Sequence, residues 1–197
     1  MITFISQEVL LTEGIFRESG SAKAYRALKE RLICGAPVYL HEESVLVMAS
    51  VLKDFLRNVE GSVFSFPQYE TWLGIMNKDN EEEKMTAARS LLEMLPRANQ
   101  MRLKHLFAML SQIHQNSYLN LRTSYNLAVC TASSLMAPPP DASPGFDIEL
   151  MRKEGEISEI FYIISIDNGG QMRPQVLGRL PCHRVGAQKY GAGFAAS

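Results

Sequence analysis

The sequence lacks the features that mark several large protein classes. Its three cysteines, Cys34, Cys130 and Cys182, are too few and too far apart for a disulfide framework or a CxxC metal site, which favours a reducing compartment. No stretch approaches the ~20 apolar residues that a membrane span needs. The first ten residues also lack the basic start of a signal peptide. We therefore expect a cytoplasmic protein without a membrane span.

An excess of charge of one sign is also missing. The chain has 20 Lys and Arg against 21 Asp and Glu, a formal net charge of -1, and no expected helix carries a basic stripe. This balance argues against a DNA-binding domain or any other nucleic-acid partner. The four histidines are spread without ligand spacing, and neither a Gly-rich phosphate loop nor a serine-nucleophile motif is present. We expect no metal site and no cofactor.

Helical periodicity runs from Ser21 to about Met136 and predicts an all-α fold. Apolar residues recur at helical spacing in six segments, 22–34, 42–58, 67–76, 80–95, 100–115 and 125–136. Ser21, Asn99 and either Thr123 or Ser124 are the expected N-caps, and Gly35 is the expected stop of the first helix. The segment 125–136 is apolar nearly all round, which predicts a helix buried at the centre of a bundle.

The composition changes beyond the Pro-rich breaker "APPPDASPG". One last helix is expected over 148–166, although "IFYIISI" has strand propensity as well. After Asp167 the chain has no acidic residue, six glycines and four basic residues, which predicts a disordered, mildly basic tail. We expect one domain over residues 1–166 and a tail over 167–197.

Three features carry candidate chemistry, each with a structural alternative. Arg17 lies between two glycines in "TEGIFRESGSA", where a solvated loop arginine beside Glu18 is the simpler interpretation. Lys53 and Arg57 are four residues apart, about 40° round a helix, at the edge of its apolar stripe. They suit either a shared functional side or a solvated face. Asn126, in the apolar segment, is either a tie between helices or an amide at the end of a groove.

Together these motifs resemble the Rho-GAP domain, a helical module that activates Rho-family small GTPases. "EGIFRESGSA" is similar to the arginine-finger loop of that family, "VLKDFLRN" to its Lys-x-x-Leu-Arg helix, "LPRANQMRLKHLFAML" to its Leu-Pro-x-x-Asn helix start and "NLRTSYNLAVCTASSL" to its Asn-containing core helix. The order and spacing agree over about residues 2–136. The variants resemble most the subgroup of the T-cell activation Rho GTPase-activating protein.

The resemblance implies a Rho-GAP-like helical bundle that supplies a catalytic arginine in trans and is not itself an enzyme. Arg17 would be the finger, Arg57 would brace its loop, Lys53 would contact the GTPase, and Asn126 would hydrogen-bond it at the groove edge. The partner would be a Rho-family small GTPase in its GTP-bound state, which brings its own nucleotide and magnesium. The alternative is a catalytically silent Rho-GAP-like module that binds GTPases or other partners without activating them.

The chain departs from the family pattern at four places. It begins inside the helix that precedes the finger loop in the family, so we expect a fold truncated at its N-terminus. Ser133 replaces a proline, which we expect to loosen the loop at the groove. Arg122 stands where the family usually has an apolar residue, so that either it faces solvent or its corner repacks. "RNVEGSVFS" lacks a common Pro-rich turn.

Overall fold

The computed structural model describes residues 9–136, 152–153, 155–157 and 160, and these residues form helices and turns without a strand. The expected all-α class is confirmed. In chain order the elements are α2 (Ala22–Ile33), η1 (Leu40–Glu42), α3 (Val45–Arg57), η2 (Phe66–Gln68), α4 (Tyr69–Ile75), α5 (Glu81–Met94), α6 (Arg97–Gln115), α7 (Ser117–Asn120) and α8 (Ser124–Leu135). The expected tail, 167–197, lies outside the described residues.

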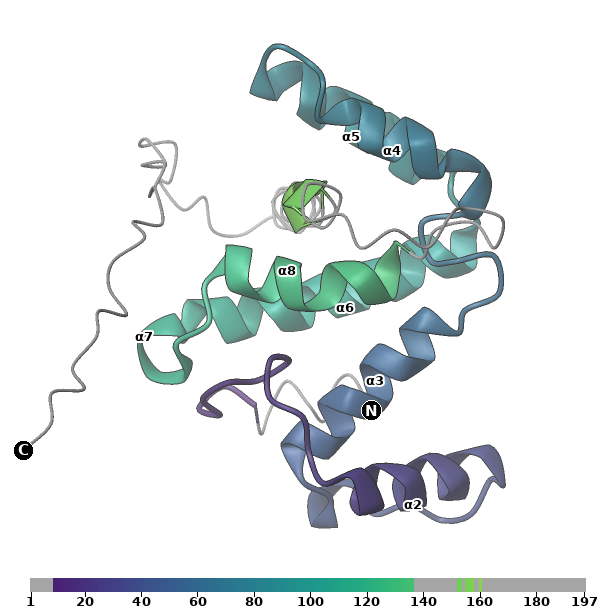
Figure 1. The fold of residues 1–197 in the computed structure, drawn as a ribbon, viewed down its shortest axis with the longest axis vertical. Helices are drawn as coiled ribbons and strands as arrows, with labels where there is room; N and C mark the ends of the chain where they lie inside the picture. Colours follow the sequence, from purple (N-terminus) through teal and green to yellow (C-terminus); the bar gives the residue numbers. More distant parts are fainter. Residues whose placement is uncertain (1–8, 137–151, 154, 158–159, 161–197) are drawn as a thin grey trace, which may run out of the picture.

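Helices α6 and α8 lie side by side at the centre of the fold, and α3 packs against α8 (Figure 1). Helix α2 packs on α3, whereas α4 and α5 pair with each other at the opposite end of the molecule. The largest fully buried side chains come from α2, α3, α4, α6 and the loops between helices, and include Trp72, Phe64, Leu28, Leu52 and Leu106. A shared core therefore fixes α3 and α8 relative to each other.

Local sequence explains where α2 begins and ends. The Ser21 hydroxyl accepts a hydrogen bond from the Ala24 amide at 3.5 Å, as an N-cap should. At the other end Gly35 adopts a φ of +67°, and the amides of Gly35 and Ala36 donate to the carbonyls of Leu32 and Arg31. This pair of bonds is the Schellman motif, in which glycine takes the left-handed position at no steric cost. The expected cap and stop are both confirmed.

A turn at residues 62–64 joins three helices through hydrogen bonds of the Ser62 side chain and of the turn's backbone carbonyls. The Ser62 hydroxyl donates to the Leu135 carbonyl at the end of α8 at 2.9 Å. The Asn99 amide donates to the carbonyls of Ser62 and Val63, and the Trp72 indole donates to the Phe64 carbonyl at 2.8 Å. Because these groups are buried, each bond satisfies a backbone atom that water cannot reach. The turn fixes the end of α8 against α6 and α4.

The expected role of Asn99 as a helix cap is wrong. Helix α6 already begins at Arg97, after Pro96, so that Asn99 lies in its first turn. Its side chain is 5% exposed and is used to hold the turn at residues 62–64. Thr123 does cap α8 as expected, since its Oγ1 accepts from the Asn126 amide at 3.2 Å.

Helix α8 is not buried all round as its composition predicted. Tyr125 and Val129 are 46% and 41% exposed, while Leu127, Ala128 and Leu135 are buried. A Cβ added at Gly155 would lie 3.0 Å from Val129 Cγ2, so the described part of the last expected helix packs over this side of α8. Residues 152–153, 155–157 and 160 are helical, and Ile157 and Ile160 are buried.

An ion pair ties α2 to the last turn of α3. Lys29 Nζ lies 2.7 Å from Asp54 Oδ2, and Asp54 Oδ1 accepts from the Asn58 amide at 3.2 Å. Burial alone would raise the pKa of Asp54, but the hydrogen bond and the charge of Lys29 outweigh burial and lower that pKa. The hydrogen bond to Asp54 likewise raises the pKa of Lys29.

Gly20→Ala should destabilise the protein because Gly20 touches the backbone of α3. A Cβ there would lie 2.5 Å from Val47 Cγ2 and 2.6 Å from the Val47 amide nitrogen. We expect a loss of about 1–3 kcal/mol in the free energy of unfolding, measured by urea denaturation. The matched control is Gly74→Ala in α4, where an added Cβ meets nothing within 4 Å. This substitution should raise the free energy of unfolding by about 0.5–1 kcal/mol. Equal effects of the two substitutions would contradict this account.

Asp54→Asn should lower stability near neutral pH and lose its effect in acid. The lowered pKa of Asp54 means that its ionised form stabilises the fold above the ordinary carboxyl pKa. That contribution disappears as the pH falls through the lowered pKa of the folded state. Urea midpoints measured from pH 7 down to pH 2 should therefore converge for wild type and variant. A difference that persists in strong acid would show that packing, not charge, explains the effect.

Candidate functional site

Two buried side chains hold the loop that presents Arg17. Ile15 and Phe16 are 0% and 1% exposed, and they join the core directly before Arg17. The amides of Arg17 and Glu18 both donate to the Gly14 carbonyl, at 3.0 and 2.9 Å. The Arg17 side chain itself is 61% exposed, and its Nη2 lies 3.1 Å from Glu18 Oε1. The loop is therefore anchored, while its cation projects into solvent beside one exposed carboxylate.

The direction of this loop depends on an unusual backbone conformation at Phe16. Its φ is +64°, a left-handed value that costs a bulky residue roughly 1–2 kcal/mol. Lys53 Nζ, from α3, donates to the Phe16 carbonyl at 2.6 Å. The buried ring and this hydrogen bond offset the strain. Strained backbone of this kind is concentrated at functional sites.

The two glycines of the loop have different roles. Gly14 has a φ of +74°, and a Cβ there would meet the Glu18 side chain at 2.7 Å. The Cα of Gly20, in contrast, lies against Val47 at the start of α3. Gly20 thus allows the loop to approach the backbone of α3 closely, which fastens the loop to this helix.

Lys53 and Arg57 divide their roles differently from the expectation. Lys53, not Arg57, braces the loop, whereas Arg57 Nη2 reaches Ser134 Oγ on α8 at 3.4 Å. Burial is the main cause that lowers the pKa of Lys53, and the nearby charge of Arg57 acts in the same direction. Spacing alone could not separate the two residues, because the position of Phe16 relative to α3 is a tertiary feature.

Asn126 lies one and two helical turns before Cys130 and Ser134 on the same face of α8. Cys130 is close enough to Lys53 to affect its pKa, and Ser134 accepts from Arg57, so this face is turned toward α3. The Asn126 side chain is partly buried and makes no hydrogen bond to another described residue. The side-chain amide of Asn126 therefore remains available on the face of α8 that is turned toward α3.

Two family departures have definite positions. Ser133 is exposed on α8 and lies within the helix, so the expectation of a loosened loop there is wrong. Arg122 is 5% exposed, which excludes the solvent-facing alternative. No sequence signal distinguished these outcomes, because both residues occupy positions whose burial is set by neighbouring helices.

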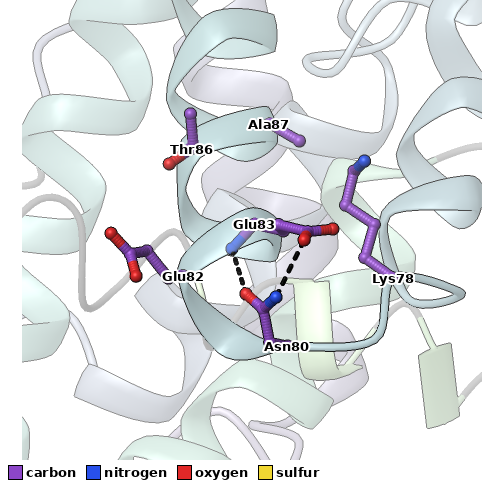
Figure 2. Close-up of a pocket in the computed structure, with 6 residues that line it drawn as sticks. All are labelled: Lys78, Asn80, Glu82, Glu83, Thr86 and Ala87. Carbon is purple, nitrogen blue, oxygen red and sulfur yellow. Dashed lines mark hydrogen bonds between the residues drawn. The ribbon is translucent and has the colours of Figure 1, made fainter.

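Two hollows beside α5 lie away from the Arg17 loop (Figure 1). The first, about 570 Å³, is lined by Lys78, Asn80, Glu82, Glu83, Thr86 and Ala87 (Figure 2). Its Asn80 and Glu83 bond to each other, with the Glu83 amide donating to Asn80 Oδ1 at 2.8 Å, which is the N-cap of α5. The second, about 420 Å³, is mainly apolar. Helix capping accounts for Asn80 and Glu83 among the polar groups of the first hollow.

None of the helices that the structure describes combines the length and the apolar character needed to cross a membrane. Within the same residues, no three His, Cys, Asp or Glu side chains gather as metal ligands.

The geometry defines a class of protein: an all-helical scaffold that projects one arginine from a braced loop beside two packed helices, α3 and α8. The RhoGAP domain family matches residues 1–140, and the chain belongs to this family. It is 47% identical to human Rho GTPase-activating protein 20 over 153 residues, 78% of this chain and 13% of that protein. It is 38% identical to the mouse T-cell activation Rho GTPase-activating protein over 138 residues, 70% of this chain and 19% of that protein.

These comparisons confirm the resemblance to the family and to the T-cell activation protein. The chain spans less than a fifth of the length of these two curated relatives. Among solved structures, human Rho GTPase activating protein 15 matches with a TM-score of 0.75 and 22% identity, over 83% of this chain and 78% of that chain. The BH domain of GRAF matches with a TM-score of 0.74 and 22% identity, over 84% and 88%. The Rho-GAP-like bundle is thereby confirmed.

Lys53→Met should loosen the Arg17 loop without unfolding the domain. Methionine keeps the apolar stem but removes the donor to the Phe16 carbonyl, a hydrogen bond from a charged group worth roughly 1.5–3 kcal/mol. We expect the amides of Arg17 and Glu18 to exchange with deuterium about 10-fold faster. Lys104→Met, on an exposed position of α6, is the control. Unchanged exchange in the Lys53 variant would show that Ile15 and Phe16 alone hold the loop.

Proposed function

We propose that this chain activates GTP hydrolysis by a Rho-family small GTPase, to which Arg17 supplies a guanidinium in trans. The observation that carries the proposal is the contrast between a fixed loop and an exposed cation. Ile15 and Phe16 are buried and Lys53 holds the Phe16 carbonyl, whereas the Arg17 side chain is 61% exposed. Membership of the RhoGAP domain family and the names of its relatives support the partner class.

The chemistry explains why the projecting residue is an arginine. Hydrolysis of GTP builds negative charge on the oxygens of the transferred phosphoryl group, and a positioned cation stabilises that charge. Arginine remains charged and offers a planar fork of donors to those oxygens. The GTPase, in its GTP-bound state, brings nucleotide and magnesium. Arg17 must exchange its exposed ion pair with Glu18 for the phosphates, at a cost of less than about 1 kcal/mol.

The remaining site residues have distinct roles in this proposal. Lys53 positions the finger through the Phe16 carbonyl, and Arg57 fastens α3 to α8 through Ser134. Asn126, whose side-chain amide makes no hydrogen bond to another described residue, hydrogen-bonds the GTPase beside α3 and α8. A preordered finger loses less entropy on binding than a flexible loop would.

Arg17→Ala should abolish stimulated hydrolysis while largely sparing binding. Arginine fingers of GTPase-activating proteins contribute ~10³–10⁵ to the rate, so single-turnover hydrolysis in the presence of the variant should return almost to the intrinsic rate of the GTPase. The control is Arg26→Ala, which removes an exposed arginine of α2 that contacts only its own helix, and should leave stimulation intact. Equal stimulation by wild type and the Arg17 variant would refute the finger assignment.

The same assay separates activation from the alternative of a catalytically silent module. In that alternative, wild type binds a GTPase loaded with a non-hydrolysable GTP analogue but leaves single-turnover hydrolysis unchanged. The ion pair between Arg17 and Glu18 is the feature that bears on this alternative, because the arginine must leave Glu18 to reach the phosphates. Since breaking an exposed pair costs less than about 1 kcal/mol, Glu18→Gln should leave a silent module silent.

A further inference from the structure

Arg122 is a buried cation that forms no ion pair with another described residue. The residue is 5% exposed, and its Nε is sealed from solvent without a hydrogen-bond partner. The ion pairs of the described residues engage Arg17, Lys29, Arg31, His41, Lys84 and Arg152, and none of them includes Arg122. Burying a charge without a partner costs free energy of folding. A hydrogen-bond acceptor on another molecule would therefore stabilise Arg122.

The corner that holds Arg122 lies between the Arg17 loop and helix α8. The Arg122 amide donates to Asn120 Oδ1 at 2.8 Å, and Asn120 Nδ2 donates to the Leu10 carbonyl at 3.0 Å, at the start of the described chain before the loop. Arg122 directly precedes Thr123, the N-cap of the 12-residue α8. Figure 1 shows this corner between α7 and α8, beside the loop.

Two features of the corner favour an anionic acceptor. The N-terminus of α8 carries a partial positive charge, which attracts anions and adds to the field of the guanidinium. Only Nε among the side-chain polar atoms of Arg122 is both sealed and unpartnered, so the terminal amino groups keep contact with the surface. A planar pair of donors at the surface matches the two oxygens of a carboxylate.

The surroundings favour an acceptor on a protein rather than a free ion. Tyr118, Leu121 and Tyr125 are exposed at 76%, 57% and 46%, and they lie within four residues of Arg122 along the chain. Along the chain the desolvated charge is thus flanked by exposed apolar and aromatic residues, and aromatic residues are enriched at protein–protein contacts. Arg122 also lies four residues before Asn126, whose side chain is proposed above to contact the GTPase.

We propose that Arg122 binds a carboxylate side chain of the GTPase and so contributes to partner affinity and selectivity. This inference rests on the function proposed above and adds a contact to it. The charge costs stability in the free domain and is matched only in the complex. A purely structural Arg122 has a different consequence, because an apolar residue of similar length would then improve the fold and leave binding unchanged.

Arg122→Met tests the proposal through two readouts of opposite sign. Methionine fills the same space without the charge, so Tm should rise by about 3 °C, while Kd for a GTPase loaded with a non-hydrolysable GTP analogue should increase about 10-fold. Wild-type binding should also weaken more with added salt than binding of the variant. The matched control is Arg97→Met, an exposed residue at the first turn of α6, which should change neither quantity.

Several outcomes would overturn the proposal. Binding of Arg122→Met within twofold of wild type across a panel of Rho-family GTPases would show that the corner makes no contact. Failure of this variant to fold would show that the charge serves the fold itself. Arg122→Lys keeps the charge but not the fork, so it should keep the wild-type Tm and bind less tightly than wild type; binding equal to wild type would exclude a fork-specific contact.

The nature of the acceptor and the underlying function are separated by two further arms. Inorganic phosphate that binds the wild type through Arg122 would indicate a free-anion site and would refute the carboxylate. If no GTPase of the panel binds the wild type, both this inference and the proposed function fail. If the wild type stimulates hydrolysis and Arg122→Met binds equally well, only this inference fails.

Discussion

The hydrogen bond from Lys53 to the Phe16 carbonyl is the interaction on which the candidate site depends. Phe16 has a strained backbone that turns its ring into the core and the next side chain outward. A buried ring alone would fix the residue but not the direction of its peptide group. The lysine fixes that direction, and the burial that lowers its pKa also shields the bond from water. The Arg17 side chain is thus exposed because the core fixes the residue before it.

The position of α8 relative to α3 is fixed by contacts that lie at some distance from Arg17. The turn at residues 62–64 binds the end of α8, and Arg57 adds a contact from α3 to Ser134 near that end. Asn99 completes this arrangement from α6. Because α8 is fixed at its C-terminal end, its N-terminal end can present Asn126 and the Arg122 corner in a defined position. In the proposed function, stability and recognition are therefore located at opposite ends of one helix.

Much of the fold could be predicted from the sequence, because helices follow local rules. The cap at Ser21, the stop at Gly35 and the cap at Thr123 depend on residues a few positions apart, and all three were predicted correctly. The cap at Asn99 was predicted wrongly, because its amide is used by a turn 36 residues earlier. The same limit applies to Lys53 and Arg57. Their four-residue spacing identifies a shared face, but only packing decides which one reaches the loop.

The contact between Gly20 and Val47 makes α3 one of the supports of the Arg17 loop. The end of the Arg17 loop is fastened to the first turn of this helix, and Lys53, further along, holds the middle of the loop. Helix α3 thus supports the loop at two points, so the arginine keeps a constant position relative to α3 and moves with it. Helix α2 contacts α3 through the ion pair between Lys29 and Asp54. A ligand or modification that shifts α2 would therefore displace the arginine without touching it.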